Sequence, residues 1–170
     1  MKFRPSYILI PLVTIIVALL GSEFTTVGMG WYNSEVVKPA LEPPRWAFPV
    51  VWNTIFVLTT ISAIMIWNKE TTRKIFWFSF KKTPTPAEWM VMWLFVVNAI
   101  LNVLWSYLFF AKEMISAALI EMIIMEILLI ALIFGAWKIS KIATSLLLPY
   151  AVWVGIATYL TYNIYILNVV

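Results

Sequence analysis

The sequence predicts an all-α integral membrane protein built as a five-transmembrane-helix bundle. Hydrophobic residues make up 63% of the 170-residue chain and charged residues only 12%. A soluble domain could not hide that much apolar surface from water. The apolar residues gather in five long stretches, each close to the roughly 20 residues that a helix needs to cross a bilayer. Any functional site must therefore be built between these helices.

The five stretches account for most of the chain. We expect helices at about 6–26, 46–67, 89–111, 114–137 and 142–167. The gaps between them are too short for a further domain, so residues 1–170 are expected to form a single membrane domain. The first stretch could imitate a signal peptide, but Gly21-Ser22-Glu23 does not resemble a small-residue cleavage site. We therefore favour an uncleaved first helix.

Lysine and arginine residues divide unequally between the two ends of the predicted bundle. Nine lie on the side of the N-terminus and three on the other side. The nine are Lys2, Arg4, Lys69, Arg73, Lys74, Lys81, Lys82, Lys138 and Lys141, and the three are Lys38, Arg45 and Lys112. Since cytoplasmic loops carry the excess of positive charge, we expect the N-terminus inside and the C-terminus outside. The same residues are placed to meet lipid headgroups, so nucleic acid is not an expected partner.

Two of the predicted connections have unusual compositions. The link at about 27–45 and the start of the next helix contain four prolines, at positions 39, 43, 44 and 49. They favour a stiff loop that loses little entropy on ordering and could serve as a lid over the helix ends. The connection from Asn68 to Glu88 places Phe76, Trp77, Phe78 and Phe80 among basic residues, which indicates contact with the headgroup layer. Its last residues, from Thr83 to Glu88, look like a helix entry into Trp89.

Several common chemistries are excluded by composition. The chain contains no cysteine and no histidine. It therefore has no disulfides, lacks the usual general base and lacks the usual haem ligand. We expect no resident cofactor and no metal.

The third predicted helix carries a polar and aromatic face. Asn98, Asn102, Trp105 and Phe109 recur at spacings of four, three and four, which places them on one side of the helix. The amide of Asn102 lies near mid-span and must meet another helix or a ligand. Contact between helices and ligand binding are both open at this point.

The last predicted helix should be kinked at Pro149, because a proline frees a backbone carbonyl one turn earlier. Trp153 then falls inside the span, where its indole N–H needs a partner, and Ala157 leaves room beside it. Trp52 and Phe56 on the second helix could face the same cavity. Core packing remains the alternative for all four residues.

The fourth predicted helix contains two carboxyl groups. Glu121 lies within about two turns of the helix start, so it could be interfacial, whereas Glu126 is deeper and should be protonated, paired or in a wet cavity. Their spacing of five places them on different faces, so they do not form one paired-carboxylate site. A proton relay is a further possibility.

Motifs along nearly the whole chain resemble those of the translocator protein family, also called tryptophan-rich sensory proteins. Each motif is weak alone, but together they occur in order on the expected spans. They are Trp31-Tyr32, Lys38-Pro39, Pro43-Pro44-x-Trp46, Val51-Trp52, Leu101-Asn102-Val103-Leu104-Trp105, Ala118-Leu119-Ile120-Glu121, Leu148-Pro149-Tyr150-x-x-Trp153 and Ala157-Thr158-x-Leu160.

The resemblance implies a five-helix bundle, usually dimeric, in a prokaryotic cytoplasmic membrane, with a pocket near the first loop. Family ligands are porphyrins, sterols and synthetic aromatic drugs. The animal sterol motif is incomplete, because no basic residue follows Tyr162, so sterol recognition is not supported. Carried over by position, the ligand-binding residues are Tyr32, Pro44, Trp52, Phe56, Asn102, Trp105, Trp153 and Ala157.

Three functions follow as hypotheses. The first is a receptor or sensor for porphyrin-like tetrapyrroles, metal-free because no histidine is available as a ligand. The second is an enzyme for light-dependent porphyrin breakdown, in which Trp52 and Trp153 would donate electrons. The third is a transporter of porphyrins or other small apolar molecules, although the sequence contains no internal repeat.

Overall fold

The computed structural model describes residues 5–69, 72–75, 78–81 and 85–169 and confirms the predicted fold class. Five helical segments are long and apolar enough to cross a membrane, so the chain is an integral multi-pass membrane protein. Its elements are α1 (Ser6–Ser34), α2 (Ala47–Trp67), β1 (Thr72–Ile75), β2 (Phe78–Lys81), α3 (Pro86–Ser106), η1 (Tyr107–Ala111), α4 (Ile115–Trp137), α5 (Lys141–Ser145) and α6 (Leu148–Asn168).

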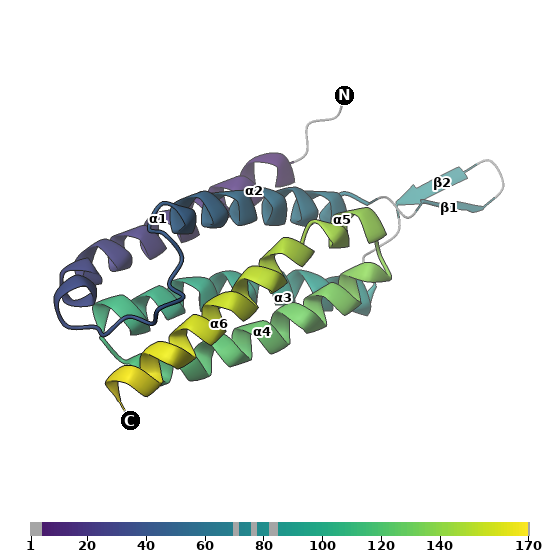
Figure 1. Ribbon diagram of the computed structural model, residues 1–170. Helices are drawn as coiled ribbons and strands as arrows, with labels where there is room; N and C mark the ends of the chain where they lie inside the picture. The colour runs from purple at the N-terminus through teal and green to yellow at the C-terminus, as the bar shows by residue number, and fades with distance from the viewer. Residues whose placement is uncertain (1–4, 70–71, 76–77, 82–84, 170) are drawn as a thin grey trace.

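The core of the bundle lies where α4 packs against α3 and α6. Figure 1 shows α1 and α2 along one side of the bundle and α3, α4 and α6 along the other. The buried residues of α4 recur at spacings of three and four, which makes one continuous stripe on the helix. The stripe consists of Ile115, Ala118, Met122, Met125, Leu129, Leu132 and Ala136, and Glu121 is buried beside it. In lipid this stripe stabilises the bundle through close van der Waals packing rather than through exclusion of water.

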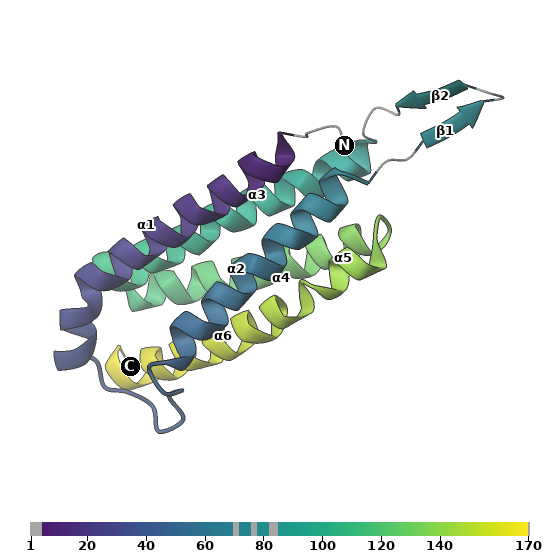
Figure 2. The same cartoon turned by 90° about the horizontal axis from the view of Figure 1, so that it is seen from above.

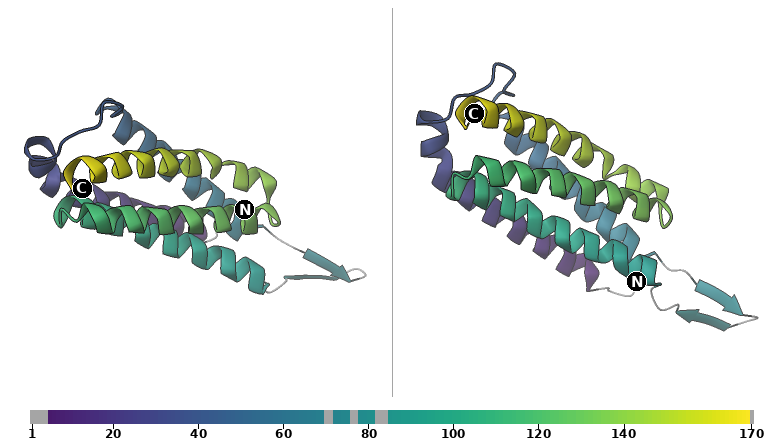
Figure 3. Two further views of the ribbon diagram at one scale, coloured as in Figure 1. Left: turned by 60° about the horizontal axis from the view of Figure 1, so that its bottom comes forward. Right: turned by 90° about the horizontal axis from the view of Figure 1, so that it is seen from below.

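The two ends of the bundle differ. One end carries the loop at 35–46 and the C-terminal end of α6, and the other carries α5 and the β1–β2 hairpin (Figure 3). The strands pair in antiparallel register from Thr72 opposite Lys81 to Ile75 opposite Phe78. Phe76 and Trp77 lie outside the described residues, so the expected headgroup contact of this connection stays a prediction.

α1 is longer than the sequence analysis expected. The prediction that it ends near residue 26 is wrong, because the helix continues to Ser34 and shortens the loop to 35–46. The hydroxyl of Thr25 donates to the Gly21 carbonyl, and the hydroxyl of Ser34 donates to the Gly30 carbonyl. Such bonds pair side-chain hydroxyls within the helix. Pro11 lies inside α1 without ending it, and the next proline is Pro39.

The last span is broken near its start, as Pro149 predicts. α5 ends at Ser145 and α6 begins at Leu148, with Pro149 in its first turn. Between them the backbone N–H of Leu147 donates to the Thr144 carbonyl at 2.9 Å, and that of Tyr150 donates to the Leu147 carbonyl at 3.1 Å. These tighter turns bring Tyr150 into the core immediately after the break.

The third span begins with a capping box and ends in a π-helix. The hydroxyl of Thr85 accepts from the backbone N–H of Glu88, and the Glu88 carboxylate accepts from the Thr85 N–H. The helix therefore begins at Pro86, three residues before the predicted start. At the other end η1 replaces the regular α-helix, a change that the spacing of apolar residues did not predict. π-Helical segments of this kind frequently lie at functional sites.

Gly28 allows α1 to approach η1 closely. A Cβ atom built at Gly28 would overlap the backbone carbonyl group of Phe110, whereas one built at Gly30 would meet nothing within 4 Å. The backbones of α1 and η1 therefore touch at Gly28, where only glycine fits.

Substitution of Gly28 by alanine should destabilise the bundle. We expect a loss of about 1–3 kcal/mol in the free energy of unfolding, because the backbone of η1 must move to admit the methyl group. Thermal unfolding of the purified protein in detergent, followed by circular dichroism, measures the change. Gly30→Ala is the matched control and should leave the melting temperature unchanged or slightly higher. Equal melting temperatures for both variants would contradict the close contact.

Candidate functional site

The centre of the candidate site is a hydrogen bond between α3 and α6. The amide nitrogen of Asn102 donates to the hydroxyl oxygen of Tyr150 at 3.1 Å, and this hydroxyl donates to the sulfur of Met125 at 3.7 Å. Asn102 and Tyr150 are 7% and 3% exposed. The sequence required a partner for Asn102, and the structure supplies it on another helix.

Tyr150 belongs to a set of five aromatic side chains on α2 and α6. We call them the core aromatic group: Phe48, Trp52, Phe56, Tyr150 and Trp153. The Trp52 ring lies 6.1 Å from the Tyr150 ring and 5.8 Å from the Phe56 ring, measured between centroids. Phe48 packs edge-on against Trp153 at 5.8 Å. Ala157, one turn beyond Trp153, is buried in the same core cluster.

A second set of rings lies at the loop end of the bundle. We call it the lid aromatic group: Tyr32, Trp105, Phe109 and Phe110. Trp105 stacks on Phe109 at 5.3 Å, and Tyr32 contacts Phe109 at 5.9 Å and Phe110 at 5.7 Å. Trp105 packs against both hydrophobic core clusters and so connects the lid aromatic group to the core.

The loop at 35–46 is attached to α1 through polar contacts. The Tyr32 hydroxyl donates to the Glu42 carboxylate at 2.7 Å, and the Lys38 ammonium lies 4.7 Å from the centre of the Tyr32 ring. Lys38 and Arg45 both donate to the side-chain oxygen of Asn33, at 3.4 and 3.0 Å. Two positive charges therefore converge on one neutral oxygen at the mouth of the site.

The same loop is fastened to the end of α6. The side-chain oxygen of Asn168 accepts from the backbone N–H of Val37 at 2.8 Å, and its amide nitrogen donates to the Val37 carbonyl at 3.0 Å. Val36, beside it, is buried against Phe109, Ile115 and Ile164. We call this pair of hydrogen bonds the lid clasp. It closes the loop over the helix ends.

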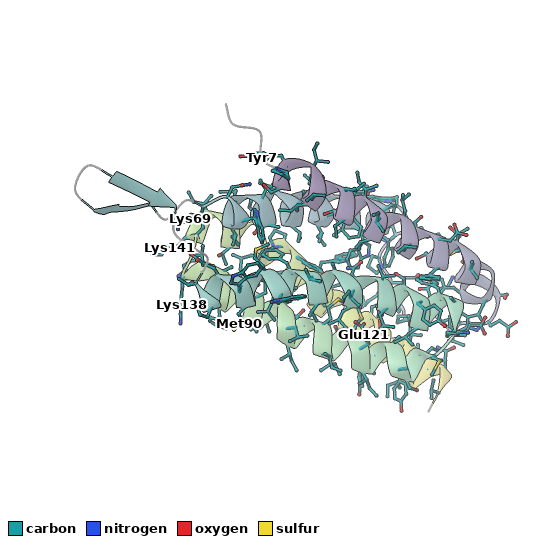
Figure 4. The ribbon with its side chains drawn as sticks, turned by 180° about the vertical axis from the view of Figure 1, so that it is seen from behind. Tyr7, Lys69, Met90, Glu121, Lys138 and Lys141 are labelled. Carbon is teal, nitrogen blue, oxygen red and sulfur yellow. The ribbon has the colours of Figure 1, made fainter. Side chains whose placement is uncertain are left out.

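The indole groups of Trp105 and Trp153 are buried without a hydrogen-bond partner in the described part of the chain. Such groups point to a ligand, because an unpaired donor in an apolar interior is unfavourable. Glu121 is only 5% exposed and lies inside the bundle (Figure 4), while its expected interfacial depth stays a prediction. Glu121 is buried because α4 turns this face toward the core. Glu126 is partly buried, on a different face.

The structure brings most of the predicted site residues into two connected groups. Trp52, Phe56 and Trp153 lie in the core aromatic group, with Asn102 and Ala157 beside it, and Tyr32 and Trp105 lie in the lid aromatic group. Pro44 is exposed one turn before α2. The sequence analysis did not include Phe48 or Tyr150 among the site residues. One sequence feature could have identified them: each lies next to a proline, Pro49 or Pro149, that marks the start of a helix.

Free space at the site is small. A cleft of about 50 Å³ lies between α1, α2 and α3, with Phe56, Asn102 and Tyr150 in its wall. Pockets for drug-sized ligands span about 300–1,000 Å³. The structure is therefore a closed form, and a large ligand needs the walls of the site to move apart.

Comparisons with known proteins agree with this architecture. The sequence profile described as the TspO/MBR family matches residues 8–167. The tryptophan-rich protein TspO of Chlorobaculum tepidum is 31% identical over 152 residues, covering 89% of this chain and 89% of that protein. Its counterpart in Archaeoglobus fulgidus is 32% identical over 157 residues, covering 92% and 93%. The translocator protein of Bos taurus is 29% identical over 147 residues, covering 86% and 80%.

Replacing Asn168 by alanine should release the loop. The change removes both hydrogen bonds of the lid clasp, each contributing about 0.5–1.5 kcal/mol. We expect hydrogen–deuterium exchange of the loop at 35–46 to become about tenfold faster, as measured by mass spectrometry. Asn163→Ala is the control, since Asn163 bonds only to the Tyr159 carbonyl on its own helix. Unchanged exchange in Asn168→Ala would show that the clasp does not hold the loop.

Proposed function

The chain belongs to the TspO/MBR family, and from that premise and its site geometry we propose that it is a membrane receptor for porphyrin-like tetrapyrroles. The observation that carries the proposal is the set of aromatic rings on α2 and α6 that packs beside the Asn102–Tyr150 hydrogen bond, together with the indole N–H of Trp153, which has no partner among the described residues. Flat apolar macrocycles bind by stacking on such rings and by burial of their surface.

The core aromatic group would supply the stacking surface. Trp52 and Trp153 approach Tyr150 and Phe48 respectively at ring distances near 6 Å, in edge-on geometry. A planar ligand between α2 and α6 would replace these edge contacts by face contacts. The indole N–H of Trp153 and the amide of Asn102 would donate hydrogen bonds to it.

The loop end of the site, where Lys38 and Arg45 lie, suits carboxylate groups at the edge of the ligand. Lys38 and Arg45 both bond to a neutral amide oxygen rather than to a carboxylate. Their remaining N–H groups could donate to a porphyrin propionate. The lid clasp would open to admit the ligand and close over these groups.

The orientation of the bundle is part of the proposal. Lys69, Lys138 and Lys141 gather at the hairpin end (Figure 4). The strands place Arg73, Lys74 and Lys81 at the same end. We expect this end in the cytoplasm, because positive loops are retained there. The lid then faces the opposite side of the membrane, and a homodimer is the expected assembly.

Titration with protoporphyrin in the dark tests the receptor function. Absorbance of the porphyrin should shift saturably with wild-type protein in lipid nanodiscs. Trp52→Phe and Trp153→Phe should each weaken binding by roughly three- to tenfold, because a stacking surface and an indole donor are lost. Trp93→Phe is the matched control, since Trp93 is 63% exposed on α3. Unchanged affinity in both core variants would refute the proposed site.

Illumination of the same samples tests light-dependent breakdown. This second function is favoured by the burial of Trp153 within the proposed porphyrin site, where it could supply an electron to an excited macrocycle. A distinct product should form with wild type and not with Trp153→Phe. If both proteins give only ordinary bleaching, the chain is a receptor without this activity.

The charged mouth makes a separate prediction. Arg45→Ala should weaken binding of protoporphyrin by about two- to fivefold, the range expected for an exposed ion pair. The same change should leave binding of protoporphyrin dimethyl ester unaffected, because the ester carries no carboxylate. Raising the salt concentration should reduce the difference. Equal losses for acid and ester would mean that Arg45 acts on the loop rather than on the propionates.

A further inference from the structure

The cleft between α1, α2 and α3 is a second place where polar groups converge inside the span. Each helix contributes one stripe to it, and Tyr150 of α6 closes the inner side. The lining residues are Val13, Thr14, Val17, Phe56, Thr59, Phe95, Asn98, Ala99, Asn102 and Tyr150. None of these residues is charged. Phe56 and Thr59 lie near the middle of α2, and Phe95, Asn98 and Ala99 lie near the middle of α3, so the cleft lies at the depth of the bilayer core.

Two side chains of this cleft carry unused hydrogen-bonding capacity. The amide nitrogen of Asn98 and the hydroxyl of Thr59 are buried and have no partner among the described residues. Asn98 is only 4% exposed. The neighbouring polar side chains already have hydrogen-bond partners. Asn102 bonds to Tyr150, and the Thr14 hydroxyl bonds to the Thr60 hydroxyl at 2.7 Å. Both unpaired groups can donate, so the cleft offers donors that meet no acceptor.

We propose that this cleft binds the carbonyl oxygen of an uncharged, lipid-soluble ketone through Asn98 and Thr59. A carbonyl oxygen accepts hydrogen bonds and donates none, which complements the two donors. The uncharged wall disfavours an ion. The volume of about 50 Å³ exceeds the roughly 30 Å³ share of one water molecule. It therefore admits a polar end, while the apolar body of the ligand lies against Val13 and Val17.

The α1 wall of the cleft is suited to lateral entry from the bilayer. The most apolar stretch of α1 has no residue buried inside the bundle. Figure 2 shows α1 and α2 close together at the hairpin end and diverging toward the lid. Their side-chain contacts include the bonds Ser6–Asn68 and Thr14–Thr60. A ligand from the bilayer can thus reach the cleft past α1 without passing the lid clasp.

This site overlaps the proposed porphyrin site at its inner wall but does not coincide with it. The two share Phe56, Asn102 and Tyr150, but neither Trp52 nor Trp153 lines the cleft. The ketone proposal does not depend on porphyrin binding, and the two can fail independently.

Photolabelling with benzophenone tests the proposal on wild-type protein in nanodiscs. Under near-ultraviolet light the ketone oxygen takes hydrogen from a nearby C–H bond, and the ketone carbon then bonds to that carbon. Mass spectrometry should find saturable labelling of the peptides that contain Val13–Val17 and Phe95–Ala99. Excess fluorenone, which has the carbonyl, should suppress it, whereas fluorene, which has the same rings without it, should not. Equal suppression by both competitors would overturn recognition of a carbonyl group.

Variants then identify the donors. Asn98→Leu and Thr59→Val should each raise the half-saturating benzophenone concentration about three- to tenfold. Thr59→Ser keeps the hydroxyl and should label like wild type. Thr54→Val is the control, because Thr54 is exposed on α2 and bonds to its own helix. Circular dichroism and thermal unfolding check that each variant is folded, and the comparison of fluorenone with fluorene uses the wild-type protein.

Two outcomes would reject the cleft as the site. Unsaturable labelling spread over all lipid-facing helices would mean that benzophenone reacts only from the bilayer. Saturable labelling confined to peptides containing Trp52 and Trp153 would place the ketone in the core aromatic group. In the second case the porphyrin site would still stand, so the two proposals remain distinguishable.

Discussion

The hydrogen bond between Asn102 and Tyr150 is the interaction on which the centre of this bundle depends. Within a bilayer no water is available to an unpaired amide, so the amide must be satisfied by protein or ligand. Tyr150 directly follows Pro149, where the last span restarts, and its ring also packs edge-on against Trp52. Tyr150 therefore links three helices: its hydroxyl bonds to Asn102 on α3, and its ring packs against Trp52 on α2.

The sequence predicts the features of this fold that follow from local chemistry. Hydropathy locates five spans because a bilayer requires about 20 apolar residues for each, and Pro149 predicts the break in the last one. Two features could not be predicted in this way. α1 continues to Ser34 because its end packs against η1 at Gly28, and η1 is a π-helix whose apolar residues read equally well as α-helix. Both depend on contacts between segments about 80 residues apart.

The candidate site was predictable where a polar or aromatic residue is conspicuous inside a span. Asn102, Trp105 and Trp153 are such residues, and each lies in or beside the two aromatic groups. Phe48 and Tyr150 were missed because a phenylalanine or tyrosine in a membrane helix is unremarkable until its partner is known. The lid clasp is equally invisible in the sequence, since the Val37 side of it consists of backbone atoms alone. The protoporphyrin titrations of Trp52→Phe and Trp153→Phe test whether these residues bind a ligand.

The cleft between α1, α2 and α3 is small, so one of the surrounding elements would have to move for a large ligand to bind. Separating α4 from α3 and α6 would break the part of the α4 stripe from Met122 to Ala136, whose members are at most 1% exposed, and would lose close packing that lipid does not replace. Moving the loop breaks a few neutral hydrogen bonds, each contributing about 0.5–1.5 kcal/mol. α1 is held to α2 by bonds of the same kind. α1 also packs against α3 and η1, with backbone contact at Gly28, so the loop is the more movable wall and the α3–α4–α6 core is the fixed frame.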